Sequence, residues 1–491
     1  MHILFATSEA HPLIKTGGLA DVCGALPKAL SQLSLDHLKN GKDNIEVKLV
    51  MPAYGAVLAK LKHPKTLANI QVLGEACSLI VGKMPDSEIE VIAIKNAALY
   101  ERAGGPYSDE NGIDWLDNAL RFGVLSRVAS LLCSTNSPLQ NWLPDLIHCN
   151  DWQTGLAPLY MKLLDNSKTK SILSIHNIAF QGCFNANWLK QLELPAAHFH
   201  INGYEYHEQI SFLKAGLFYA DKLSTVSPTY AQEIQTTEFG FGLEGLLQTR
   251  SDDLIGILNG IDADEWNPAT DGHLPKNYSN KRITGKHAVK HALQQQLGLD
   301  IKANAPILGI VSRLTHQKGL DLLPSIMPKL VELGCQFAIL GSGEKKLGAS
   351  FNALAERYPT QVSMNTGYHE HLSHNIMAGS DLFIMPSRFE PCGLNQLYGL
   401  AYGTPPIVSN TGGLADSVCD TTNLTLKNNS ATGFVIKNVS SSSLLVTIQH
   451  ALTIWQDKKT WRKIQKNGMS QDISWISSAK PYLSFYQQAF K

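Results

Sequence analysis

The sequence predicts an α/β protein with two domains, each a parallel sheet covered on both faces by helices. Short apolar runs rich in β-branched residues alternate with helix-length segments along almost the whole chain, and this alternation is typical of βαβ units. The chain has 491 residues, which is more than one hydrophobic core usually supports. Strands that are buried on both faces are continuous apolar runs without strict alternation, as these are.

The predicted strands form two series. The first series lies at residues 2–7, 47–51, 89–94, 146–149, 171–175, 222–226 and 254–258, and the second at 307–312, 337–340, 382–385 and 406–409. A polar stretch rich in Pro, Asn and Lys, residues 266–282, separates them and is expected to be a loop. An aromatic-rich segment of helix length, residues 472–490, is expected to pack on one of the sheets.

Composition excludes several classes of protein. Basic and acidic residues balance at 42 each, which gives no support for a nucleic-acid partner. No apolar run approaches the roughly 18 residues of a membrane span, and no basic segment precedes the first strand. The eight cysteines are scattered without a C-x-x-C pair, so we expect reduced thiols and a cytoplasmic protein, with no membrane partner.

A glycine loop follows the first predicted strand. Lys15, Gly17 and Gly18 stand between that strand and an apolar helical pattern over residues 19–33. Paired glycines let a ligand approach the backbone, and the N-terminus of a helix favours an anion. The loop is therefore either a site for a phosphorylated ligand or an ordinary βα turn that uses glycine for packing. It does not match G-x-G-x-x-G, and the chain has no G-x-x-x-x-G-K-[ST].

Two cations follow the first strand of the second series. Arg313 and Lys318 lie five residues apart at the carboxyl end of this strand, where open parallel sheets bind ligands. Guanidinium and ammonium groups both bind phosphate oxygens, so the pair predicts a second anion site; the alternative is a solvated loop with two surface cations. Gly341 begins a glycine turn after the next strand.

A carboxylate follows the strand at 382–385. Glu390 precedes a predicted helix start, where the backbone N–H groups of Gly393 and Leu394 are expected to meet an anion. A carboxylate in this position binds sugar hydroxyls well. The alternative is a helix N-terminal charge, which contributes up to ~1 kcal/mol of helix stability.

Polar residues also end two strands of the first series. Asp151 follows the strand at 146–149, and His176 follows the strand at 171–175. A lone histidine is more often structural, but these two positions correspond at one edge of a sheet, which favours a functional role. Tyr107 lies in a loop, and no strand end or helix start near it in the sequence indicates a functional role.

Two metal-like patterns are dismissed. The segment at 369–374 reads His-Glu-His-Leu-Ser-His, and H-E-x-x-H would need histidine at Ser373. His371 and His374 could share a helix face, but the sequence shows no third ligand at a known spacing, so no metal is expected. Asp262 and Asp264 resemble a D-x-D motif, yet they follow an Asn-Gly turn and are expected to form a turn or hinge.

Taken together, the motifs resemble the glycogen/starch synthase family of retaining glycosyltransferases. The matching segments occur in order: KTGGLADV (15–22), HCNDWQTGL (148–156), IHNIAFQG (175–182), STVSPTYAQEI (224–234), NGID (259–262), SRLTHQKG (312–319), GSGE (341–344), TGYHE (366–370) and RFEPCGLNQLYGLAYG (388–403). They cover almost the whole chain and are far more specific together than singly.

The resemblance implies the GT-B architecture, with two Rossmann-like domains facing a cleft. It implies an N-terminal domain of residues 1–254 on the acceptor side, completed by a C-terminal helix at 471–491, and a donor-side domain of residues 255–470. The implied reaction transfers glucose from ADP-glucose to the non-reducing end of an α-1,4-glucan, such as glycogen or a malto-oligosaccharide. It proceeds with retention, without a metal or other cofactor, after the domains close.

The resemblance also implies roles for individual residues. Arg313 and Lys318 would neutralise the departing diphosphate, Glu390 would hold glucose hydroxyls, and His176 would lie against the glucose. The implied substrate-binding residues are Lys15, Gly17, Gly18, Tyr107, Asp151, Asn177, Gly341, Tyr368, Cys392, Gly393 and Leu394. Many retaining enzymes of this fold carry a second glutamate eight positions after the first; here Tyr398 stands there, which matches the glucan-synthase form.

Three alternatives remain at this level. A dinucleotide-dependent oxidoreductase should carry G-x-G-x-x-G in the first βα turn, and this chain does not. A non-catalytic glucan-binding relative would be expected to lose Lys318 or Glu390, and both are present. A glucosyltransferase of the same fold that uses UDP-glucose is the closest enzymatic alternative, because no residue discriminates the two bases on physical grounds.

Overall fold

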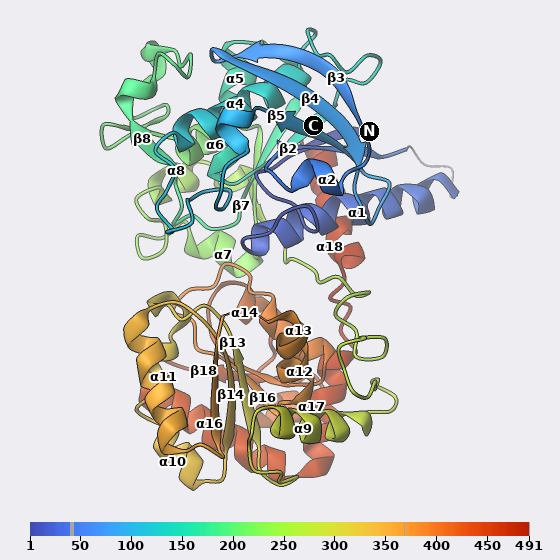
Figure 1. The fold of residues 1–491 in the computed structure, drawn as a ribbon, viewed down its shortest axis with the longest axis vertical. Coiled ribbons are helices and arrows are strands. Elements are labelled where there is room, and N and C mark those ends of the chain that lie inside the picture. Colours follow the sequence, from blue (N-terminus) through green and yellow to red (C-terminus); the bar gives the residue numbers. More distant parts are fainter. Residues whose placement is uncertain (40–43, 368, 491) are drawn as a thin grey trace. The chain divides into compact units, whose positions relative to one another are not determined.

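The computed structural model describes residues 1–39, 44–367 and 369–490, and these residues divide into two compact units. Unit 1 comprises Met1–Asn259 and Trp475–Lys491, and unit 2 comprises Gly260–Ser474. The sequence placed the changes of domain after residues 254 and 470. Both units are drawn in Figure 1.

Unit 1 is built on a sheet of nine described strands in the order β12-β11-β7-β6-β1-β2-β5-β4-β3. The strands from β12 to β5 pair in parallel, as the apolar runs predict. Their bounds are β1 His2–Ala6, β2 Glu46–Pro52, β5 Glu90–Lys95, β6 Leu146–Asn150, β7 Lys170–Ile175, β11 Lys222–Thr225 and β12 Leu254–Gly256.

The structure adds antiparallel strands that the sequence reasoning missed. β3 (Lys62–Val72) and β4 (Glu75–Lys83) form a hairpin that pairs antiparallel with β5 and extends the sheet (Figure 1). Three short strands, β8 (Cys183–Asn185), β9 (Glu205–Tyr206) and β10 (Gln209–Ser211), make a separate sheet. β3 is mostly exposed, so its sequence lacks the continuous apolar run by which the parallel strands were found.

Helices cover both faces of this sheet because crossovers between parallel strands are right-handed. From β1 the chain moves to β2 through α1 (Gly18–Lys39), whereas α4 (Asn118–Leu132), α5 (Leu156–Leu163) and α6 (Phe212–Tyr219) lead in the opposite direction along the sheet. The final helix, α18 (Trp475–Gln488), belongs to unit 1 and packs against α1 (Figure 1).

α18 is fastened to the core of unit 1 by a buried histidine. The Tyr486 hydroxyl lies 2.7 Å from Nδ1 of His148 on β6, and Nε2 of His148 lies 2.6 Å from the Ser174 hydroxyl on β7. Burial lowers the pKa of His148 to about 3, so this ring is neutral and joins the two hydroxyls by hydrogen bonds.

Unit 2 is a six-stranded parallel sheet in the described residues, in the order β15-β14-β13-β16-β17-β18. The strands are β13 Ile307–Val311, β14 Gln336–Gly341, β15 Val362–Thr366, β16 Leu382–Met385, β17 Pro406–Ser409 and β18 Phe434–Ile436. β15 and β18 were not among the predicted strands; β15 is only half-buried and β18 has three residues.

Helices lie on both faces of this second sheet (Figure 1). One face packs against α10 (Met327–Glu332), α11 (Lys345–Arg357) and α16 (Ser441–Gln456). The other packs against α9 (Gly285–Gln296), α12 (Glu370–Gly379) and α13 (Asn395–Ala401). Each unit is therefore doubly wound. Within the described part of the chain, none of the helices combines the length and apolar character that crossing a membrane requires.

The order of strands reverses once in each unit. In unit 1 the winding reverses between β1 and β6, and in unit 2 it reverses between β13 and β16. Ligands of open α/β sheets bind at such reversals, beyond the carboxyl ends of the strands. The loops that follow these strands carry most of the residues singled out from the sequence.

Candidate active site

The glycine loop of unit 1 is held by a buried carboxylate that the sequence reasoning missed. Glu9 is 2% exposed, and its Oε2 accepts hydrogen bonds from the Thr16 amide at 2.6 Å and the Thr16 hydroxyl at 2.7 Å. Its Oε1 accepts the Tyr107 hydroxyl at 2.7 Å. The sequence signal available was an acidic residue shortly after a buried strand. Glu9 thereby links the glycine loop to Tyr107, a residue whose sequence surroundings alone did not indicate a functional role.

The two glycines of this loop are not required by packing. A Cβ atom built on Gly17 or Gly18 would meet no described atom within 4 Å. The ordinary packing turn therefore does not explain these residues, whereas an approaching ligand would use the open backbone. Lys15, on the same loop, pairs with Asp21 at 2.6 Å and stays partly exposed.

Asp151 and His176 are brought together at the carboxyl ends of β6 and β7. Oδ1 of Asp151 accepts the backbone N–H of His176 at 2.7 Å and that of Asn177 at 3.4 Å. Asp151 adopts a φ of 54°, a strained conformation for a residue with a side chain. Burial raises the pKa of Asp151 to about 7, although the two N–H groups act in the opposite direction.

The tautomer of His176 is set by Asn150, which the sequence reasoning did not single out. Nδ2 of Asn150 donates to the carbonyls of Ala6 and His148, so its Oδ1 faces Nε2 of His176 at 2.9 Å. Nε2 must then carry the proton, which leaves Nδ1 as an acceptor. Burial lowers the pKa of His176 to about 3, so the ring is neutral in the physiological range.

In unit 2 the structure joins Lys318 to Glu390. Nζ of Lys318 lies 2.6 Å from Oε2 of Glu390, and these side chains are 18% and 7% exposed. The Ser387 hydroxyl donates to the same oxygen at 3.0 Å. The cation that follows β13 and the carboxylate that follows β16 therefore meet at the reversal of this sheet.

Close backbone packing fixes the geometry of this pair. Gly319 has a φ of 64°, and a Cβ there would lie 2.0 Å from the carbonyl oxygen of Pro386, so only glycine fits. Arg388, which the sequence reasoning missed, donates to both carboxylate oxygens of Asp321 at 2.7 and 2.8 Å and to the His316 carbonyl at 2.6 Å. These contacts tie the loop after β13 to the loop after β16.

The other predicted residues of unit 2 are placed differently. Arg313 is exposed, and no ion pair of this residue occurs within the described ranges. A Cβ on Gly341 would lie 2.0 Å from the Ser312 carbonyl oxygen, so packing explains this glycine. Cys392 is buried. Among the described residues, none accepts a hydrogen bond from the backbone N–H of Gly393 or Leu394, and their contact with an anion stays a prediction. Tyr368 lies outside the described residues.

Two further sequence expectations have outcomes here. Oδ1 of Asp262 accepts the N–H of Asp264 at 2.9 Å and that of Glu265 at 3.3 Å, which confirms a turn at the D-x-D pattern. Tyr398, which stands where many enzymes of this fold carry a second glutamate, is buried and stacks on Trp266 with ring centroids 3.7 Å apart.

Comparison with known proteins identifies the fold and the family of this chain. The Starch synthase catalytic domain family matches residues 2–249, and the Glycosyl transferases group 1 family matches residues 294–469. The catalytic domain of Starch Synthase IV from Arabidopsis thaliana, solved with ADP and acarbose, superposes with a TM-score of 0.85 at 31% identity, covering 99% of both chains. Anabaena HepE with UDP-glucose, at 15% identity and a TM-score of 0.56, shares the fold. The fold and these families define a GT-B glycosyltransferase.

Two curated relatives narrow this class of glycosyltransferases. A glycogen synthase of Dechloromonas aromatica is 48% identical over all of this chain and 98% of its own length. A glycogen synthase of Nitrosomonas eutropha is 46% identical over 99% of this chain and 96% of its own. The chain belongs to the glycogen/starch synthase family of glycosyltransferases, which confirms the resemblance found in its sequence.

Proposed function

We propose that this enzyme transfers glucose from ADP-glucose to the non-reducing end of an α-1,4-glucan and so elongates glycogen. The observation that carries the proposal is the full-length similarity to glycogen synthases together with the Lys318–Glu390 pair at the reversal of the unit 2 sheet. The related starch synthase solved with ADP and acarbose supports both an adenine nucleotide and a glucan-like ligand. The cytoplasmic location expected from the sequence belongs to the same proposal.

In the proposed reaction the main task is to stabilise the leaving group. The bond from C1 of glucose to the phosphate oxygen breaks, ADP departs, and O4 of the acceptor bonds to C1 on the same face. The O4 proton passes to the departing phosphate oxygen. Because the new bond forms on the face that ADP leaves, configuration is retained without a covalent intermediate. Arg313 and Lys318 stabilise the growing negative charge, because preorganised cations act most strongly on charge that develops in the transition state.

The remaining residues position the two substrates. Glu390, with the backbone of Cys392 and Gly393, holds the glucose hydroxyls. Neutral His176 offers Nδ1 as a hydrogen-bond acceptor to a sugar hydroxyl, because Asn150 holds the proton on Nε2.

In unit 1 the open backbone of the glycine loop receives the diphosphate. Lys15 and the Gly17–Gly18 pair make this contact. In unit 2 the backbone N–H group of Leu394 offers a contact to an anion. Tyr107, Asp151 and Asn177 line the sugar side, and Tyr368 is the candidate platform for adenine. Gly341 contributes through backbone packing.

A donor screen tests this proposal. ADP or UDP release is measured from each sugar nucleotide, with glycogen present and absent. We expect glycogen-dependent ADP release from ADP-glucose at a kcat/KM well above that for UDP-glucose. An equal or higher kcat/KM for UDP-glucose would refute the donor while leaving glucosyl transfer intact. Nucleotide release that is indifferent to glycogen would refute the acceptor.

A further inference from the structure

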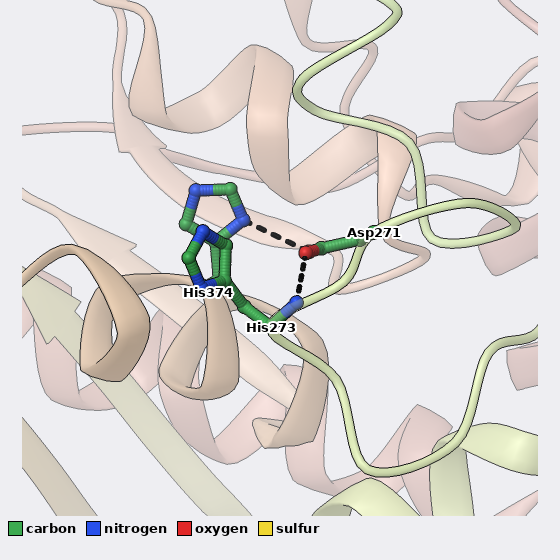
Figure 2. Close-up of side chains that lie close together, drawn as sticks. All are labelled: Asp271, His273 and His374. Atoms are coloured by element: carbon green, nitrogen blue, oxygen red, sulfur yellow. Dashed lines mark hydrogen bonds and ion pairs between the residues drawn. The ribbon is translucent and has the colours of Figure 1, made fainter.

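A cluster of potential metal ligands in unit 2 uses none of the residues assigned to glucosyl transfer. It joins α12 to the segment at residues 262–274. Its centre is His374 on α12, which is fully buried. The His374 ring is stacked on Trp266 with centroids 3.9 Å apart, and the His273 ring lies on it at 4.6 Å (Figure 2).

One nitrogen of this histidine is held by a carboxylate. Nδ1 of His374 lies 2.8 Å from Oδ2 of Asp271 (Figure 2). The same Asp271 oxygen accepts the Tyr402 hydroxyl at 2.6 Å, and Oδ1 accepts the His273 amide at 2.8 Å. Asp271 therefore accepts hydrogen bonds on both oxygens and fixes the orientation of the His374 ring.

The other nitrogen is buried without a hydrogen-bond partner. Nε2 of His374 has none among the described residues. In the tautomer whose Nδ1–H donates to Asp271, Nε2 carries a lone pair. A carboxylate that orients one nitrogen while the other faces a ligand is the arrangement found around metal-bound histidines. Buried polar atoms without a partner are rare and call for such an explanation.

Two further carboxylates complete a donor set. Glu370 precedes His374 by four residues on α12, so both side chains lie on one helix face. Carboxylate oxygens of Glu265 and Glu370 and a ring nitrogen of His374 all lie within 4.8 Å of one another. Ligands of a tetrahedral zinc ion are roughly 3.4 Å apart for bonds of about 2.0–2.1 Å. Glu370 is exposed, so rotation of its side chain can close the difference.

We propose that Nε2 of His374 and the carboxylates of Glu265 and Glu370 bind one divalent cation of the zinc class, with Asp271 orienting the histidine. One imidazole nitrogen with two carboxylate oxygens is a donor set that suits zinc, and a water molecule would take the fourth position. Asp271, His273 and His374 also lie within 4.8 Å of one another, but the bonds to Asp271 place it behind the histidine. The ion would cross-link the segment at 262–274 to α12.

The sequence could not show this site. The pattern at 369–374 fails H-E-x-x-H, and the useful pair is the glutamate and histidine at i and i+4. The third ligand, Glu265, is more than one hundred residues away in sequence, so only the fold brings it to α12.

Zinc binding by the full-length protein tests the proposal. The protein is stripped with EDTA, dialysed and titrated with ZnCl2 by calorimetry, and bound zinc is counted by mass spectrometry after gel filtration. Glu370→Gln and Glu265→Gln each remove one ligand while keeping the shape of the side chain. Glu356→Gln, an exposed glutamate on α11, is the matched control. The cysteines, two of them partly exposed, are the same in every variant. Zinc bound by thiols therefore contributes equally to each variant and does not affect the comparison.

We expect one zinc ion per chain in the unchanged protein and in Glu356→Gln, with a zinc-dependent rise in the thermal midpoint. Glu370→Gln and Glu265→Gln should bind at least about tenfold more weakly and lose that rise. Equal affinity in the unchanged protein and in Glu370→Gln would overturn the proposal, as would no zinc binding by the unchanged protein. A preference for Mg²⁺ over Zn²⁺ would overturn the assigned class of cation.

Discussion

Removing the Lys318 ammonium tests the proposed stabilisation of the leaving group. Lys318→Ala deletes a cation that lies 2.6 Å from Glu390 and, in the proposed reaction, acts on the diphosphate. Loss of one preorganised charge stabiliser lowers kcat by about 10²–10³, or ~2.7–4 kcal/mol of transition-state stabilisation. Because the interaction strengthens as the diphosphate departs, kcat should fall more than the KM for ADP-glucose changes.

The same substitution affects folding, and the two effects must be separated. A hydrogen bond between charged groups contributes about 1.5–3 kcal/mol, and little solvent reaches these side chains to replace it, since Glu390 is 7% exposed. The Ser387 hydroxyl stays on the carboxylate, so we expect a loss of about 2 kcal/mol of unfolding free energy. A protein of ordinary stability, about 5–15 kcal/mol, stays folded after such a loss.

The assay follows ADP release at saturating donor and glycogen, with urea unfolding followed by tryptophan fluorescence on the same preparation. Lys329→Ala, an exposed lysine on α10, is the control for removal of a positive charge. A folded Lys318→Ala protein with the kcat of the control would remove Lys318 from the mechanism. A loss of kcat that tracks the loss of folded protein would show a structural role instead.

Four further predictions concern neighbouring residues. Glu390→Gln should lower activity steeply in a folded protein, and a glucosyl adduct on Glu390 of the unchanged enzyme, trapped by mass spectrometry, would contradict front-face transfer. Gly17→Ala should leave the thermal midpoint unchanged, because its Cβ meets nothing within 4 Å, yet raise the KM for ADP-glucose; an unchanged KM would return the glycine to a purely structural role. Asn150→Asp places a carboxylate beside Nε2 of His176 and should raise the pKa of His176 from about 3. The pH profile of kcat/KM should then show a new inflection between roughly pH 5 and pH 8, where histidine usually titrates. An NMR titration that gives the same pKa for His176 in both proteins would refute this. Burial raises the pKa of Asp151 from 3.8 to about 7, so between these pH values the native state holds a proton that the unfolded chain has lost, and the free energy of unfolding falls as pH rises. Asp151→Asn should make this fall smaller by up to about 1.4 kcal/mol per pH unit. An identical dependence of the unfolding free energy on pH in both proteins would contradict the pKa shift.

Much of the fold could be predicted because strands buried on both faces leave a simple trace in sequence. Every apolar run named from the sequence became a strand of one of the two large sheets. The hairpin of β3 and β4 left no such trace, since β3 faces solvent along most of its length. Its pairing with β5 is a long-range contact that no local pattern encodes.

The candidate site divides in the same way. Lys318 and Glu390 were found because each follows a buried strand, but their direct contact depends on the neighbouring positions of β13 and β16. Glu9 and Asn150 were missed because their roles lie in hydrogen bonds to Thr16 and His176. The hydrogen-bond partners of such supporting residues lie outside the local sequence motif, so the motif does not reveal the supporting role.

The membership of α18 in unit 1 has a consequence for biosynthesis. The ribosome makes β1 to β12 first and all of unit 2 next, and only then the helix that packs on α1 and bonds through Tyr486 to His148. Unit 1 therefore waits in an incomplete state while unit 2 is translated, and the face of α1 that later receives α18 stays uncovered during that time. Unit 1 is thus synthesised first but completed last, and a premature stop codon after unit 2 would leave unit 1 without α18.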